Sequence, residues 1–279
     1  MKLVIDSNEL QTHRLRKFLN GSKKNIAVVA DFTAIEAYKG DPLKSVFKSM
    51  SVLSDFPTQV LVLKRSTLLV GLCGRAKGLQ RRLVDETQTK IFPKYVKNLR
   101  LAEAGDAYLQ SKVLDHGQYS NQHLSLMLSL VPEMRDAIGV LGETLTKEER
   151  KSLRSEGEYT SGLIDKVVST VLEMVSMIFD ESPFVSRRPS YDLVANTFVF
   201  RVVFATYLML LRKYSVGGLD QLSPEKLRND FVDMMFVAYG SYFDGVMSSD
   251  KNLVIVFRET CKLLFALFDA EIPSLRHYK

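Results

Sequence analysis

Short, uninterrupted apolar runs lie in the first part of the chain. Leu3, Val4 and Ile5 directly precede Asp6, and a second run occupies residues 25–30. The apolar residues in these runs do not alternate with polar ones, so each run predicts a strand buried on both faces. A helical pattern separates them, which predicts a strand–helix–strand unit of a parallel sheet. Residues 59–63 predict a third strand.

The middle of the chain has a helical pattern instead. From about residue 67 to residue 220 the strand signals disappear, and helices are expected near 124–141, 160–179 and 191–214. A good helix start follows at Ser223-Pro224-Glu225, with a capping hydroxyl and a proline at the first helical position. A short strand is then expected before Asp250, and a last helix at about 252–269. The pattern predicts an α/β domain with a central, mostly parallel sheet, formed by 1–66 plus 220–279 and interrupted by a large helical insertion, 67–219.

Composition narrows the class of protein. The 279 residues carry a net charge of +6 and a pI of about 9.1, which favours an anionic partner such as nucleic acid. The longest apolar run, 193–211, contains Asn196 and Arg201. Because an arginine inside a bilayer is costly, this run predicts a buried helix rather than a membrane span. The apolar start of the chain is too short for a signal peptide, so a soluble, cytoplasmic protein is expected.

Carboxylates occur where the expected strands and helices meet. Asp6 and Asp250 each follow an expected strand, and Glu36 lies one turn into the helix after the second strand. Asp233 lies in the helix before the last strand. Since the carboxyl ends of parallel strands share one edge of a sheet, these four side chains are expected to gather there. Such a cluster of oxygen ligands suits Mg²⁺ or Mn²⁺ and the hydrolysis of phosphodiester bonds.

Each carboxylate also has a structural interpretation that the sequence leaves open. Asp6 and Asp250 are suitable caps for the helices that follow them. Thr33-Ala34-Ile35-Glu36 matches a capping box, in which the glutamate bonds back to the start of its own helix. Asp233 is also consistent with an ordinary exposed side chain.

The same residues resemble the acidic motifs of PIN-domain nucleases. Ile5-Asp6-Ser7-Asn8 resembles the opening motif of that family, and Ala34-Ile35-Glu36-Ala37 resembles its second motif. Residues 229–235 and 248–251 are similar to the third and fourth motifs. The resemblance covers 1–66 and 220–279 and implies a PIN-like three-layer α/β domain. It assigns metal binding and catalysis to Asp6, Glu36, Asp233 and Asp250, with Ser248 and Asn8 as accessory residues. Asp230, three residues before Asp233, is an alternative for the third acidic role, and Asp244 is a weaker accessory candidate.

A cationic segment begins just after the expected α/β start of the chain. Arg75, Lys77, Arg81 and Arg82 lie within eight residues and predict either a surface that follows a nucleic-acid backbone or a solvated helix face. The glycines of 71–78 lack the Gly-Lys-Ser/Thr ending of a phosphate-binding loop. His116 and His123 have no evident third ligand for zinc.

The sequence therefore predicts a metal-dependent endonuclease. RNA is the favoured substrate, with single-stranded DNA as an alternative, because the resemblance points to bacterial toxin nucleases and RNA-processing enzymes. The sequence does not decide between a role in a toxin–antitoxin system, in phage defence or in RNA turnover. It is also compatible with an inhibitory or regulatory protein partner and with a homo-oligomer. Two other classes also stay open. One is a non-catalytic interaction protein whose helical insertion binds a partner, and the other is a helical regulatory module on an α/β scaffold.

Overall fold

The expected parallel sheet forms at the centre of the molecule. The computed structural model describes residues 1–129, 131–132, 145–154, 159–185, 188–215 and 223–278. Its four strands are β1 (Lys2–Ile5), β2 (Ile26–Val29), β3 (Val60–Val62) and β4 (Val246–Met247). They pair in the order β3-β2-β1-β4, and every pairing is parallel. The α/β class and all four predicted strands are thus confirmed.

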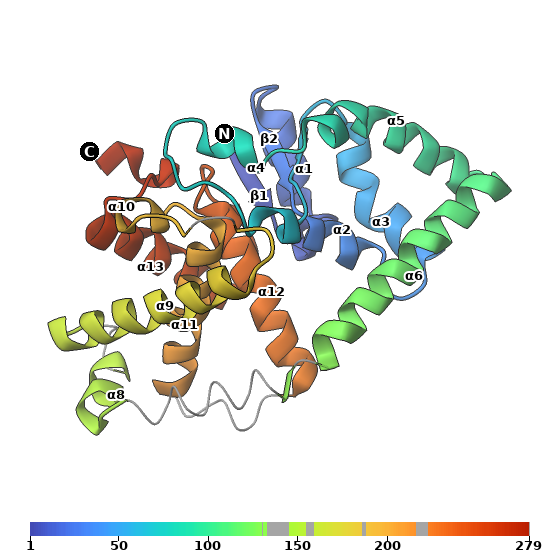
Figure 1. The fold of residues 1–279 in the computed structure, drawn as a ribbon. Helices are drawn as coiled ribbons and strands as arrows, with labels where there is room; N and C mark the ends of the chain where they lie inside the picture. Colours follow the sequence, from blue (N-terminus) through green and yellow to red (C-terminus); the bar gives the residue numbers. More distant parts are fainter. Residues whose placement is uncertain (130, 133–144, 155–158, 186–187, 216–222, 279) are drawn as a thin grey trace.

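Helices account for most of the rest of the described chain (Figure 1). In the first half, in chain order, they are η1 (Ser7–Glu9), α1 (His13–Gly21), α2 (Asp31–Ala37), α3 (Pro42–Asp55), η2 (Ser66–Leu69), α4 (Leu79–Leu83), α5 (Glu86–Glu103) and α6 (Ala107–Ser129). In the second half they are α8 (Lys147–Arg154), α9 (Ser161–Glu181), α10 (Tyr191–Val194), α11 (Phe198–Ser215), α12 (Pro224–Gly240), α13 (Lys251–Phe268) and η3 (Pro273–Tyr278).

The sheet has a helical layer on each face, because its apolar runs have no polar side. Val4 and Val28 pack into one core with side chains of α4, α11 and α12, whereas Ile5 and Val29 pack into a second core with α1, α3 and α5. In Figure 1, α3 and α5 lie on one side of β1 and β2, and α12 and α13 lie on the other. A third core joins α9, α11 and α13 beyond the sheet. Helices from residues 67–219 therefore contribute to all three cores.

Several helix boundaries differ from their prediction. The helix expected at 124–141 begins much earlier, at Ala107, and its expected second half lies outside the described residues. The domain boundary expected at 219/220 lies outside them too. The helix expected at 191–214 is divided into α10 and α11. Thr197 is responsible for the division, because its hydroxyl donates to Val194 O and accepts from Phe200 N.

The arginine in the longest apolar run lies in the protein core. Arg201 is 0% exposed, and its guanidinium group donates five hydrogen bonds, to Ala195 O, Asn196 Oδ1, Glu271 O and both oxygens of Ser241. Burial lowers the pKa of Arg201, and the carbonyl oxygens around it offset part of that cost by accepting charge-assisted bonds. Among the described residues, no helix combines the length and apolar character that a membrane span needs.

Candidate metal-binding and nuclease site

Asp6 lies at the carboxyl end of β1, where the resemblance expects the first acid. Its side chain is 1% exposed and accepts a 2.6 Å hydrogen bond from Ser248 Oγ, just beyond β4. Ser248 Oγ in turn accepts a bond from the backbone N of Asp250, at 3.0 Å. One serine therefore links the ends of two neighbouring strands and their two aspartates. Burial raises the pKa of Asp6, although the bond from Ser248 opposes that shift.

Glu36 lies beside Asp6, on the helix that follows β2. That helix, α2, is held against the end of β1 by Thr33, whose hydroxyl donates to Ile5 O at 2.9 Å. Burial raises the pKa of Glu36, a bond from Ser7 lowers it, and the charge of Asp6 raises it again. The capping-box alternative is wrong, because α2 begins at Asp31 and Thr33 already lies inside it.

Asp233 is the carboxylate most affected by the others. It lies on α12, is partly buried, and has a pKa raised to about 8. Burial is the largest cause, and the charges of Asp6, Asp250, Asp230 and Glu36 follow in that order. The side chain is therefore not an ordinary exposed one. Four elements of the fold bring these acids close enough to affect one another.

Asp250 caps the helix that follows it, as one of its two interpretations from the sequence predicted. It is the N-cap of α13, and its Oδ1 accepts bonds from Asn252 N at 2.7 Å and Leu253 N at 3.0 Å. Both bonds end on Oδ1, so Oδ2 lies outside the cap. The charge of Asp250 still acts on Asp233. The capping role and a place in the cluster are therefore compatible.

The accessory candidates have different positions. Asn8 bonds to both oxygens of Asp6, at 3.5 Å from each, which places it at the site. Asp230 forms an ion pair with Lys213, and its charge helps to raise the pKa of Asp233. The accessory role expected for Asp244 is wrong. Its Oδ2 accepts a hydrogen bond from Lys2 N at 2.7 Å, at the amino end of β1. It therefore lies at the opposite end of the strand from Asp6.

Two carboxylates near the cluster, one buried and one partly buried, were not singled out from the sequence. Asp31, just beyond β2, accepts bonds from the backbone N and hydroxyl of Ser66 and from Tyr239 OH. Glu9 is 1% exposed and pairs with Arg14, which also donates to Ser248 O. Asp31 follows an apolar run just as Asp6 does, so the same sequence signal could have identified it. Its bonds show that it ties α2 to η2 and α12.

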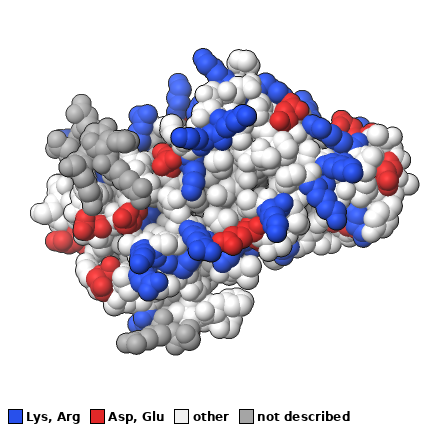
Figure 2. Space-filling view, turned by 90° about the horizontal axis from the view of Figure 1, so that it is seen from above, with Lys and Arg blue, Asp and Glu red and all other residues white. Residues whose placement is uncertain are grey.

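Three of the four cations of the segment 75–82 have contacts away from this cluster, and the fourth, Arg75, is exposed. Lys77 and Arg81 line a cavity beside Lys2, at the amino end of β1. Arg82 is not free to contact a nucleic-acid backbone, because its guanidinium group donates to the backbone O atoms of Cys73, Arg75 and Lys77. Many Lys and Arg side chains gather on this face, seen in Figure 2 from above the view of Figure 1. The basic face and the acidic cluster thus lie at opposite ends of the sheet.

The carboxylates do not form a closed cage for an ion as they stand. Within the described part of the chain, no three His, Cys, Asp or Glu side chains meet at the spacing of metal ligands. The donor set nevertheless fits a hard divalent cation, because it consists of carboxylate oxygens whose like charges raise the pKa of Asp233.

Comparisons with protein-family models, curated proteins and solved structures gave no match to this chain.

Proposed function

We propose that this protein is a metal-dependent nuclease of PIN-like type that hydrolyses phosphodiester bonds in RNA or single-stranded DNA. The observation that carries the proposal is the gathering of Asp6, Glu36, Asp233 and Asp250 at the carboxyl end of β1 and β4. Ligand sites of open parallel sheets lie at this edge. The order of the four acids along the chain is that of the family motifs.

Asp6, Glu36, Asp233 and Asp250 are the proposed ligands of Mg²⁺ or Mn²⁺. Such an ion, when bound, supplies an activated water and neutralises charge on the phosphate. Asp6 is held in place by Ser248, and Asp250 by its cap on α13. These two form the fixed part of the site, and Glu36 and Asp233 are the residues that turn toward an ion. Because the pKa of Asp233 is about 8, ion binding near neutral pH is expected to release a proton from it.

The second candidate is a non-catalytic interaction protein, and a separate observation favours it. The α5–α6 hairpin exposes several large apolar side chains, among them Tyr108 at 69%, Leu126 at 60% and Tyr119 at 49%. Such a surface suits an inhibitory or regulatory protein partner or a homo-oligomer. Retention of all four acids favours the nuclease. A cytoplasmic location, and a role in RNA turnover, a toxin–antitoxin pair or phage defence, belong to the same proposal.

A cleavage assay tests the proposal. End-labelled single strands of RNA and of DNA with the same sequence are incubated with Mg²⁺, Mn²⁺ or excess chelator. The proposal predicts cleavage with either ion and none with chelator. Asp6→Asn and Asp250→Asn should remove it, since the asparagine amide keeps the shape of the side chain but not its charge. Asp244→Asn is the matched control, because it lies at the other end of β1 and its amide oxygen still accepts from Lys2 N.

Two results would contradict the nuclease proposal. One is full cleavage by both Asp6→Asn and Asp250→Asn, and the other is full cleavage in excess chelator. A parent protein that cleaves neither strand, while its circular dichroism shows a folded chain, favours the interaction protein instead.

A further inference from the structure

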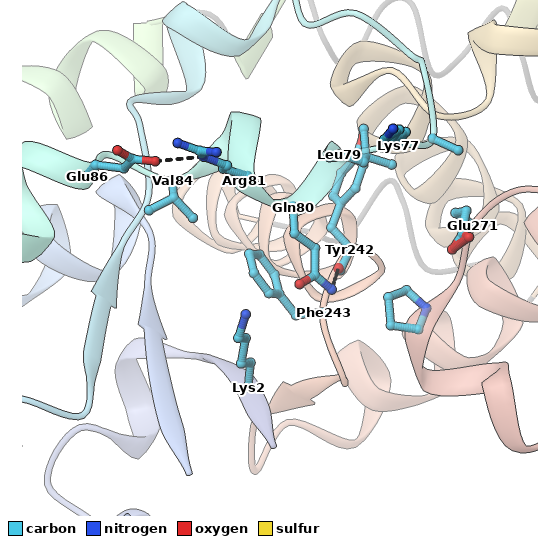
Figure 3. A pocket seen from close by; sticks show the side chains of 13 residues that line it. Lys2, Lys77, Leu79, Gln80, Arg81, Val84, Glu86, Tyr242, Phe243 and Glu271 are labelled. Atoms are coloured by element: carbon cyan, nitrogen blue, oxygen red, sulfur yellow. Dashed lines mark hydrogen bonds and ion pairs between the residues drawn. The ribbon is translucent and has the colours of Figure 1, made fainter. Parts of the chain in front are cut away.

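A cavity of about 530 Å³ lies at the amino end of the sheet, far from the carboxylates. Lys2 at the start of β1 forms its base, and α4 with the loop before it forms one wall. The turn after α12 and the start of η3 complete it (Figure 3). Between Lys2 and Asp6 the strand rises by about 13 Å at about 3.3 Å per residue, which separates the cavity from the acidic cluster.

Five charged side chains line this cavity, of which three are cations (Lys2, Lys77 and Arg81) and two are carboxylates (Glu86 and Glu271). Lys2 and Lys77 form no ion pair among the described residues. Arg81 pairs with Glu86 at 3.0 Å, and both side chains are largely exposed. The carboxylate of Glu271 acts on the buried Arg201, whose guanidinium lies 4.0 Å from the centre of the Tyr242 ring. The unbalanced charge in the cavity is therefore positive.

The wall that carries Lys77 is fixed before any ligand binds. Arg82 donates to the backbone O of Lys77 at 2.7 Å and of Cys73 at 3.0 Å, and so holds the loop in shape. Gly78 has a φ of +75°, a left-handed conformation that glycine adopts without strain. Gln80 donates to Tyr242 O at 2.7 Å and joins this loop to the opposite wall. A preformed wall lowers the entropy cost of ligand binding.

Apolar side chains line part of the cavity, and the volume of the cavity suits a nucleotide. Leu79, Phe243 and Pro273 line it between the cations. Pockets for small ligands typically have volumes of about 300–1,000 Å³ and combine an apolar surface with a few polar groups. The lining cations suit a phosphate, and the apolar side chains suit the flat ring attached to it.

We propose that this cavity binds a nucleotide unit, with its phosphate on Lys2 at the base and its flat ring against the apolar side chains, and with Lys77 as a second cation on the opposite side. The unit is either a free nucleotide or one residue of a single strand. The cavity is a second site, which binds without a metal ion and performs no chemistry. Its occupation does not depend on the nuclease proposal, because none of its lining residues belongs to the carboxylate cluster.

Binding is measured by fluorescence anisotropy with a labelled single-stranded RNA, and by calorimetry with adenosine monophosphate. Excess chelator is present throughout, so neither metal binding nor cleavage contributes. The double variant Lys2→Gln, Lys77→Gln should bind at least tenfold more weakly. With RNA, each lost phosphate contact should also reduce the salt slope by about 0.7 log unit. Arg75→Gln is the matched control, because Arg75 is an exposed cation of the same loop that does not line the cavity.

The outcomes separate this site from the nuclease site. Asp6→Asn should bind like the parent, even if it has lost cleavage. Binding of the monophosphate identifies the free nucleotide as the ligand, and binding of RNA alone identifies the strand. The proposal is overturned if the parent binds neither ligand in chelator. It is also overturned if the double variant binds like the parent, or if Arg75→Gln weakens binding as much as the double variant.

Discussion

Replacing Asp233 by asparagine tests the electrostatics of the carboxylate cluster without any activity assay. The pKa of Asp233 is raised from 3.8 to about 8, chiefly by burial and then by the charges of Asp6, Asp250, Asp230 and Glu36. The unfolded chain releases this proton near pH 3.8, whereas the folded chain keeps it until about pH 8. The free energy of unfolding contributed by Asp233 is therefore fully present below pH 3.8 and is lost as the pH rises to about 8.

The size of the effect follows from the shift. At about 1.36 kcal/mol per pKa unit, the whole shift corresponds to an upper limit of about 6 kcal/mol. Because Asp233 is only partly buried, solvent screening reduces this, and we expect Asp233→Asn to gain about 1–3 kcal/mol at pH 8.5. Little or no gain is expected at pH 4. An asparagine cannot ionise, so the difference from the parent should grow between these two pH values and then level off.

The assay is urea unfolding of parent and variant at several pH values in the presence of chelator. Asp165→Asn, at an exposed position on α9, is the matched control and should change stability equally little at every pH. If the proposed metal site forms, adding Mn²⁺ should reduce the advantage of Asp233→Asn, because the parent then offers the ion one carboxylate more than the variant. A pH-independent effect of Asp233→Asn, or an equal gain in Asp165→Asn, would refute the reasoning.

Two further predictions concern the fold and are also measured by urea unfolding. Arg201→Met should lower the free energy of unfolding by about 3–5 kcal/mol, because it leaves several buried oxygens without a donor. Arg212→Met on the same helix is the control and should lower it by about 1 kcal/mol or less. Equal losses would contradict the role of Arg201. Gly117→Ala should destabilise the protein by more than about 1 kcal/mol, because its Cβ would lie 1.9 Å from Pro42 Cγ. Gly162→Ala, with open space around it, should instead gain about 0.5 kcal/mol. A stabilising Gly117→Ala would show that α6 does not approach α3 this closely.

The strands were predictable because their signal is local. Strands β1, β2 and β3 appear as apolar runs, and Asp6 and Asp250 mark two of the places where the chain leaves the sheet. Parallel pairing then places the carboxyl ends of the strands at one edge. The same logic brings the four acids to one edge and applies equally to Asp31, whereas Asp244, an accessory candidate, lies at the amino end of β1.

The helical region was harder because its boundaries depend on distant partners. Nothing local shows that Asn196, within the apolar run, accepts from Arg201 and from Glu271 N. Helix α5 was not predicted, although Phe92, Val96 and Leu99 form its buried side. Pro93 and many polar residues obscure that pattern in the sequence.

The basic cavity could not be predicted from the sequence. Its walls come from residue 2, residues 76–86 and residues 242–273, and only the fold brings them together. The sequence identified the cations of 75–82 but not the direction they face. It also gave no sign that Arg82 bonds its own loop rather than a ligand.

Mn²⁺ binding is the measurement that tests the central claim most directly. Calorimetric titration at pH 7.5, without nucleic acid, should show Mn²⁺ bound by the parent protein with release of a proton. Glu36→Gln and Asp6→Asn should each weaken that binding at least tenfold, and Asp244→Asn should leave it unchanged. If the parent binds no Mn²⁺, or if Asp6→Asn binds it like the parent, the carboxylates at the end of β1 are not a metal site.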